Sequence, residues 1–177
     1  TVKNPEYFRD AFLAVQELVK EGLVLAGHDI SAGGLITTLL EMCFANTKGG
    51  LELNLDKIQE QDIVKVLFAE NPGVVIQVKE SDANRVKKIL EDAGVGYAKI
   101  GAPVWNSDRK ITITKTMSNA QVPNGKIAER EMTFEFNIDE LRDVWYSTSY
   151  LLDRRQSFNG KAAERFVNYK NIPVEWS

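Results

Sequence analysis

The sequence predicts an α+β fold in which helices pack on a mixed β-sheet. Apolar residues recur with a helical period over 5–21 and again over 34–46, and the short run LVLAG at 23–27 between them has the character of a buried strand. Apolar and polar residues then alternate in LELNL at 51–55 and in EMTFEFNI at 131–138. Helical crossovers mixed with neighbouring strands are typical of α+β domains.

The two helices of the first half differ in their apolar pattern. Helix 5–21 is amphipathic and places four apolar residues on one face: Phe8, Phe12, Val15 and Val19. Helix 34–46 is apolar almost all round, so we expect it to be covered on more than one side.

The remaining elements follow from the same periodicities and from turn residues. We expect strands at 73–78, 97–104, 110–115 and 131–138 and helices at 81–93 and 139–156. One sheet is expected to contain LVLAG, LELNL, VVIQV and AKIGAPV, with the helices at 5–21, 34–46 and 81–93 packed on it. We predict a domain at 1–157, a mobile loop at 116–130 and a polar linker at 158–177.

Composition excludes several classes of protein. The 177 residues, 44% of them hydrophobic, suffice for one core, and the net charge of −3 disfavours nucleic-acid binding. A single cysteine precludes an internal disulfide, and no apolar run is long enough to span a membrane, so a cytoplasmic protein is expected. The opening residues TVKNPEYF resemble the interior of a longer chain, which suggests an excised fragment.

The chemistry of the chain is concentrated in HDISAGG at 28–34. Asp29 offers the hard oxygen that Mg²⁺ prefers, and Ser31 offers a hydroxyl for a phosphate. Gly33 and Gly34 would let backbone amides at a helix start approach an anion. Helix capping and a tight turn explain the same residues without any ligand. His28, the only histidine, is expected to be a hydrogen-bonded structural residue.

Three stretches resemble the large form of phosphoribosylformylglycinamidine synthase: AGHDISAGGLITTLLEMCFA, GLELNL and LFAENPGVVIQV. The first resembles the family pattern His-Asp-x-Ser-Asp-Gly-Gly-Leu, and the third carries its Phe-x-Glu-x-x-Gly turn. The resemblance implies a fold like the C-terminal domain of aminoimidazole ribonucleotide synthetase. It also implies part of an ATP- and glutamine-dependent ligase of purine biosynthesis, which converts formylglycinamide ribonucleotide to formylglycinamidine ribonucleotide.

The resemblance assigns site roles to four residues. Asp29 matches a magnesium ligand and Ser31 matches a nucleotide contact. Gly33 and Gly34 match family glycines that give backbone clearance for a phosphate or for the neighbouring domain. Ala32 departs from the family aspartate and removes one possible metal ligand. The implied cofactors are Mg²⁺ and ATP or ADP, and the implied partners are ATP-binding synthetase domains and a glutaminase domain beyond the linker. No catalytic residue is assigned, and the isolated fragment is predicted to be inactive because the resemblance implies that the nucleophile and most nucleotide contacts lie outside it.

Other readings stay open at this stage. The chain is alternatively a packing module whose glycine turn docks neighbouring domains around a non-catalytic nucleotide corner, or a domain of a sister ATP-dependent synthetase. Cys43 lies in an apolar helix and is not expected to be a nucleophile. Glu41 receives no site role, and Glu70 is favoured as a structural turn residue. The aromatic residues Trp145, Tyr146 and Tyr150 are expected to pack rather than to stack on bases.

Overall fold

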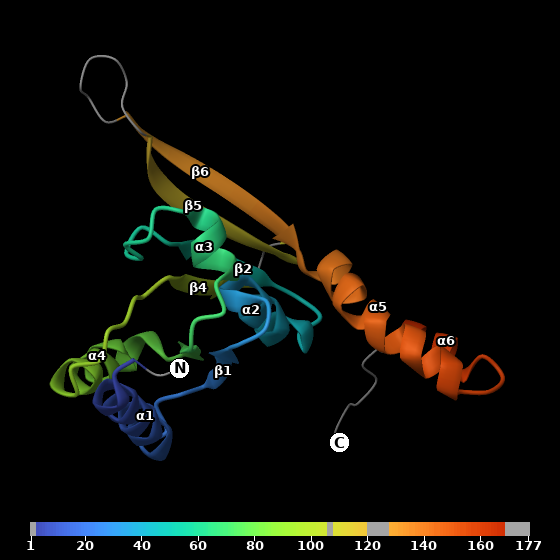
Figure 1. Cartoon of the computed structure of the whole chain (residues 1–177), viewed down its shortest axis with the longest axis horizontal. Helices are drawn as coiled ribbons and strands as arrows, with labels where there is room; N and C mark the ends of the chain where they lie inside the picture. Colours follow the sequence, from blue (N-terminus) through green and yellow to red (C-terminus); the bar gives the residue numbers. More distant parts are fainter. Residues whose placement is uncertain (1–2, 106–107, 120–127, 169–177) are drawn as a thin grey trace.

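The computed structural model describes residues 3–105, 108–119 and 128–168 of the chain (Figure 1). The elements are, in order, α1 (Pro5–Lys20), β1 (Ala26–Ile30), α2 (Gly34–Phe44), β2 (Gly50–Asn54), α3 (Ile63–Phe68), β3 (Gly73–Gln77), the 3₁₀ turn η1 (Glu80–Asp82), α4 (Ala83–Asp92), β4 (Gly101–Val104), β5 (Lys110–Asn119), β6 (Ala128–Asn137), α5 (Ile138–Gln156) and α6 (Lys161–Asn168). This order confirms the predicted α+β class, with helices packed on a mixed sheet.

The strands form two sheets rather than the single sheet expected. β1 and β3 pair antiparallel along their whole length in a two-stranded ribbon. The other sheet has the order β4-β2-β5-β6, with β2 and β5 parallel and the two outer pairs antiparallel. The prediction that 23–27 and 73–78 share a sheet with 51–55 and 97–104 was wrong. Alternation shows which side of a strand is buried, but it does not identify the strand with which it pairs.

β1 begins at Ala26 rather than at Leu23, because Leu23 is buried in a core with α1 and α4. His28 and Asp29 therefore lie in a strand and not in the predicted turn. Adjacent strand residues face opposite sides. The His28 side chain is accordingly partly buried against α2, whereas that of Asp29 is exposed.

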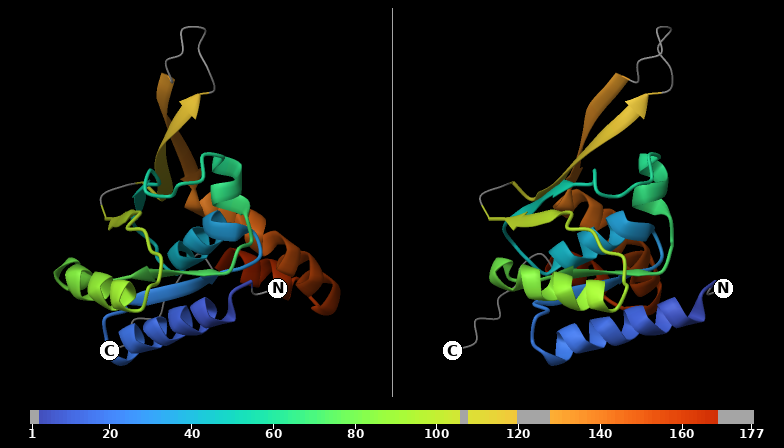
Figure 2. Two further views of the ribbon diagram at one scale, coloured as in Figure 1. Left: turned by 60° about the vertical axis from the view of Figure 1, so that its left-hand side comes forward. Right: turned by 90° about the vertical axis from the view of Figure 1, so that its left-hand side faces the viewer.

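Two apolar cores hold the elements together. The larger core lies between α2 and the four-stranded sheet and contains Leu35, Ile36, Leu39, Leu40, Cys43, Leu53, Leu55, Leu67, Ile111, Ile113 and Ile138. The smaller core joins α1 to α4 around Leu18 and Leu90, and Figure 2 shows these two helices on the same side of the molecule. Contacts of α2 with β1, α3 and α5 confirm that this helix is covered on more than one side.

The short helix α3 was not predicted from the sequence. In α3, the Asp62 side chain accepts hydrogen bonds from the N–H groups of Val64 and Lys65, which caps the helix start. Leu67 of this helix is buried against α2. Six residues are too few to display a helical period. The sequence pattern therefore reveals neither this helix nor its contact with the core.

Two segments expected to be irregular contain regular structure. Residues 116–119 and 128–130 of the predicted loop belong to β5 and β6, whose hairpin extends away from the other elements (Figure 1). Residues 120–127 lie outside the described residues. Within the predicted linker, α6 packs against α5, and residues 169–177 again lie outside the description.

The contacts of α6 explain why a polar segment becomes helical. Arg165 donates to both carboxylate oxygens of Asp153, at 2.9 and 2.6 Å. Phe166 packs against Tyr150 with ring centroids 4.5 Å apart. These partners come from α5, so tertiary contacts stabilise a helix that local sequence does not indicate.

In the three described ranges, no helix combines the length and apolar character needed to cross a membrane.

Candidate functional site

Asp29 stands near the end of β1, beside the start of α2. Its side chain is 72% exposed, and its backbone oxygen accepts a hydrogen bond from Thr38 Oγ1 at 2.9 Å. The Thr38 hydroxyl also lies 3.2 Å from the Gly34 oxygen, within α2. Ser31 follows β1 and is exposed on the same turn. The predicted metal ligand and the predicted nucleotide contact are therefore close in the chain, accessible, and supported by the buried helix beneath them.

The two predicted nucleotide-binding glycines have internal partners. Gly33 has a φ of 83°, and its N–H donates to Glu70 Oε1 at 2.9 Å. Gly34 has a φ of 72°, and its N–H donates to the Ser31 oxygen at 3.0 Å. A phosphate would have to compete with both partners. The contact with Gly33 supports the structural reading of Glu70, and the nucleotide role of the glycines stays a prediction.

Close packing gives a second reason for glycine at these positions. A Cβ atom on Gly34 would lie 2.7 Å from the Leu67 oxygen, in the backbone of α3. A Cβ on Gly33 would lie 2.2 Å from Thr37 Oγ1, which is the end of a side chain. Both residues also have positive φ angles, which favour glycine. The glycine pair therefore lets α2 begin close to α3.

A network of polar contacts joins β1, α2 and α5. His28 Nε2 lies 3.1 Å from Glu41 Oε2, and Trp145 Nε1 donates to Glu41 Oε1 at 2.8 Å. On its other side, His28 Nδ1 lies 2.8 Å from the backbone oxygen of Asp29 and 3.4 Å from Asp29 Oδ1. These contacts support the reading of His28 as a hydrogen-bonded structural residue, and its role stays a prediction. Sequence reasoning gave Glu41 no site role; the available signal was a carboxylate inside an otherwise apolar helix.

A shallow groove adjoins the β1–α2 corner, which comprises residues 28–34. The groove lies between α1 and the β1–β3 ribbon. Its volume is about 430 Å³, and it is lined by Val15, Val19, Val24, Gly27, His28, Asp29, Val74 and Ile76. On α1, Phe8 and Phe12 are also more than half exposed. The groove thus has apolar walls and a polar edge at His28 and Asp29, an arrangement typical of a surface that binds a ligand or another domain.

The residues of the corner fit a partial magnesium site. Among the described residues no group of three or more His, Cys, Asp or Glu side chains is placed to hold a metal. Mg²⁺ commonly binds one or two carboxylates and completes its shell with water and phosphate oxygens. Asp29, an exposed carboxylate next to a hydroxyl, can supply one protein ligand, and the others would come from a nucleotide and from outside this chain.

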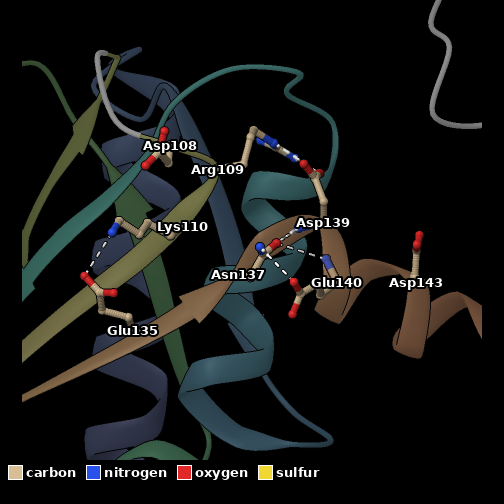
Figure 3. A pocket seen from close by; sticks show the side chains of 8 residues that line it. All are labelled: Asp108, Arg109, Lys110, Glu135, Asn137, Asp139, Glu140 and Asp143. Carbon is tan, nitrogen blue, oxygen red and sulfur yellow. Dashed lines mark hydrogen bonds and ion pairs between the residues drawn. The ribbon is translucent and has the colours of Figure 1, made fainter.

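A second pocket, of about 530 Å³, lies at the start of α5 and is lined by charged residues (Figure 3). Arg109 Nη2 lies 3.0 Å from Asp139 Oδ1, and Lys110 Nζ lies 3.0 Å from Glu135 Oε1. The Asn137 side chain accepts hydrogen bonds from the first turn of α5. The Arg109 and Asn137 contacts reach α5, and the Lys110 pair joins β5 to β6, so the polar lining is explained without a ligand.

Cys43 is buried, and the aromatic residues of α5 pack against neighbouring rings. Burial raises the pKa of the Cys43 thiol, an effect that Arg109 partly opposes. A raised pKa disfavours the thiolate that a nucleophile requires.

Trp145 packs against Phe44 with ring centroids 5.3 Å apart, and Tyr146 packs against Phe166 at 5.8 Å. The expected packing role of these aromatic residues is confirmed.

Comparison with known proteins identifies a family that this chain matches. Residues 1–107 match the family described as AIR synthase related protein, C-terminal domain. The human phosphoribosylformylglycinamidine synthase is 36% identical over 153 residues, which are 86% of this chain and 10% of that protein. The major tegument protein of Epstein-Barr virus (strain AG876) is 40% identical over 103 residues, 57% of this chain and 8% of that protein.

A solved structure has the same fold. The solved structure of T. maritima PurL complexed with ATP aligns with this chain with a TM-score of 0.56 and 17% identity, over 78% of this chain and 22% of that one. This chain therefore spans only a small part of the proteins that it resembles. Because the family match covers more than half of the chain and includes the whole β1–α2 corner, the chain belongs to the AIR synthase related protein, C-terminal domain family.

Proposed function

We propose that this chain is one domain of a large phosphoribosylformylglycinamidine synthase, an ATP- and glutamine-dependent ligase of de novo purine biosynthesis in the cytoplasm. The similarity to the human enzyme over most of the chain supports this assignment. The observation that carries it is the exposed Asp29 carboxylate, held by its backbone to Thr38 and followed by Ser31. A carboxylate so placed is suited to a magnesium nucleotide.

In this proposal the chain contributes one wall of a nucleotide site. Asp29 would hold Mg²⁺, and Ser31 would donate a hydrogen bond to a phosphate oxygen. When bound, the ion neutralises the charge of the phosphates. The chain's own residues orient the nucleotide, with Gly33 and Gly34 providing clearance for the backbone.

Other domains complete the site. The proposed partners are the ATP-binding synthetase domains and, beyond residues 158–177, a glutaminase domain. The apolar groove beside Asp29 and the exposed Phe8 and Phe12 of α1 support a seam with a neighbouring domain. The isolated chain should accordingly form no formylglycinamidine ribonucleotide from formylglycinamide ribonucleotide, ammonia and ATP, as a direct product assay would show. Turnover by the isolated chain would contradict this division.

The test of the site uses the full-length synthase that carries this segment. Asp29→Asn should weaken binding of magnesium ADP, measured by calorimetry, and should leave the melting temperature nearly unchanged. Ser31→Ala should weaken it less, since one neutral hydrogen bond contributes about 0.5 to 1.5 kcal/mol. Asp92→Asn is the matched control, because Asp92 has a similarly exposed carboxylate on α4 and pairs with Lys88.

The alternative is a packing module whose glycine turn docks neighbouring domains. The internal hydrogen bonds of Gly33 and Gly34 favour it. So does the similarity to a protein named for the viral tegument. If Asp29→Asn bound magnesium ADP as tightly as the parent while its melting temperature fell sharply, this alternative would replace the nucleotide site.

A further inference from the structure

We infer that Glu41 is a positioning residue for Asp29, and that it fixes the metal-binding carboxylate through the imidazole of His28 while being held by Trp145. This inference rests on the proposed function and extends it to three residues. Glu41 touches neither the nucleotide nor the ion. Its effect reaches the site through a series of polar contacts that crosses from α5, over α2, to β1: the hydrogen bond from Trp145 to Glu41, the contact of Glu41 with His28, and the contact of His28 with the Asp29 backbone oxygen.

Both oxygens of the Glu41 carboxylate have partners in this chain. Oε1 accepts from the Trp145 indole at 2.8 Å, and Oε2 lies 3.1 Å from His28 Nε2. A partly buried carboxylate is costly unless it is hydrogen-bonded. The Glu41 side chain is 24% exposed in a helix that is otherwise mostly buried and apolar. Packing alone would be served by an apolar residue, whereas a carboxylate can accept the indole hydrogen bond with one oxygen and contact the imidazole ring with the other.

The His28 ring contacts two oxygen atoms of Asp29 through Nδ1. His28 Nδ1 lies 2.8 Å from the Asp29 backbone oxygen and 3.4 Å from Asp29 Oδ1. One turn earlier on α2, Thr38 holds the same backbone oxygen at 2.9 Å. Thr38 and Glu41 are three residues apart, so they lie on one face of the helix. Thr38 sets the position of the Asp29 backbone, and Glu41, through His28, sets the direction of its carboxylate.

The outer end of the chain is anchored on α5. Trp145 packs against Phe44 of α2 with ring centroids 5.3 Å apart. Arg142, one turn before it, donates to the Phe44 oxygen at 3.3 Å. These contacts hold α5 against α2 and favour the position of the indole beside Glu41. Groups that hydrogen-bond to metal ligands tune metal affinity by about 10- to 100-fold. Here the group that tunes the affinity is Glu41, and its hydrogen bond with Trp145 depends on the position of α5, far along the sequence.

The experiment measures ADP binding to the full-length synthase with Mg²⁺ and with EDTA. Glu41→Ala should weaken the magnesium-dependent affinity about tenfold and leave the affinity in EDTA unchanged. Glu41→Gln, which keeps one oxygen acceptor, should fall between Glu41→Ala and the parent. Trp145→Phe keeps an aromatic ring against Phe44, removes the N–H donor, and should weaken magnesium-dependent binding in the same direction. Glu135→Gln, which breaks an ion pair with Lys110 in the other sheet, is the control and should change neither affinity.

Two substitutions at His28 test the path through the ring. A glutamine amide can take the place of Nε2 and still reach Glu41, whereas an asparagine amide can replace only Nδ1. His28→Gln should therefore retain more magnesium-dependent affinity than His28→Asn. The reverse order would overturn the path through Nε2.

A double variant separates this inference from the proposed function. In an Asp29→Asn background, Glu41→Ala should change the affinity by less than about twofold, because its effect passes through Asp29. If Asp29→Asn weakens binding but Glu41→Ala only lowers the melting temperature, Glu41 is structural and the inference is overturned. If Asp29→Asn itself has no effect, the proposed function fails, and this inference fails with it.

Discussion

The two sheets of this molecule are built for different tasks. In the four-stranded sheet, Ile111, Ile113 and Lys115 of β5 are completely buried. In the β1–β3 ribbon no residue of either strand is buried, although the structure describes all of them. The ribbon nevertheless carries His28 and Asp29, the residues with the clearest link to a ligand. The candidate site thus lies on the less covered of the two sheets.

The difference shows how the domain separates stability from recognition. The larger core, under the four-stranded sheet, holds the chain together, while the ribbon presents a surface of Val74, Ile76 and Asp29 around the groove. Exposed apolar surface of this kind is typical of an interaction site. Substitutions in the ribbon should therefore alter binding more than folding, and substitutions in β5 should do the opposite.

The largest expected effect compares one residue from each sheet. Ile113→Ala should lower the free energy of unfolding by about 2–5 kcal/mol, because it removes buried methyl groups and leaves a cavity. Val74→Ala should cost less than about 1 kcal/mol, since Val74 is 50% exposed. Urea denaturation of both variants measures the difference. Equal losses would contradict the division between a stabilising sheet and a binding ribbon.

The next effect concerns the junction between ribbon and core. Gly34→Ala should destabilise the chain by about 2–4 kcal/mol, because the residue has a positive φ and a new Cβ would meet the backbone of α3. Gly33→Ala should cost about 1–2 kcal/mol, because its Cβ would meet only the Thr37 side chain, which can rotate. Thermal denaturation gives the order. Equal stability of both variants would show that close packing does not explain the pair.

The sequence predicts the helices better than the pairing of the strands. Helices such as α1 and α5 are long and have clear local signals, including the predicted first-turn proline at Pro5. Which strands pair depends on contacts between distant segments, so the separation into two sheets was missed. The helix α6 was missed for the same reason, because Arg165 and Phe166 find their partners on α5.

The site shows a similar limit. Asp29 and Ser31 stand out because their residue types and spacing suggest metal and phosphate chemistry. The network behind them does not, because Glu41 and Trp145 are 104 residues apart and meet only through the packing of α5 on α2. The glycine turn also looked available for a phosphate. Its partner Glu70 lies 37 residues away, beyond the reach of a local pattern.

The smallest expected effect is the response of the four-stranded sheet to acid. Asp56 follows β2, and its Oδ1 accepts a hydrogen bond from the Thr116 N–H of β5 at 2.6 Å. That bond, with a further one from Asn54, lowers the pKa of the Asp56 carboxyl. A folded-state pKa below the unfolded value means that the stabilisation is fully present above the unfolded value, about 3.9. It is lost as the pH falls through the lower, folded value.

Asp56→Asn should therefore lower the melting temperature slightly at pH 7 and should flatten its decline below about pH 4. The mutant amide can still accept one hydrogen bond but has no charge to lose. Asp92→Asn, which removes an exposed pair with Lys88 on α4, serves as the control. Melting temperatures recorded across the acid range by circular dichroism would decide the matter. If Asp56→Asn and the parent lost stability in parallel, the acid response would arise outside the junction of β2 with β5, and the contrast between the two sheets would not extend to pH.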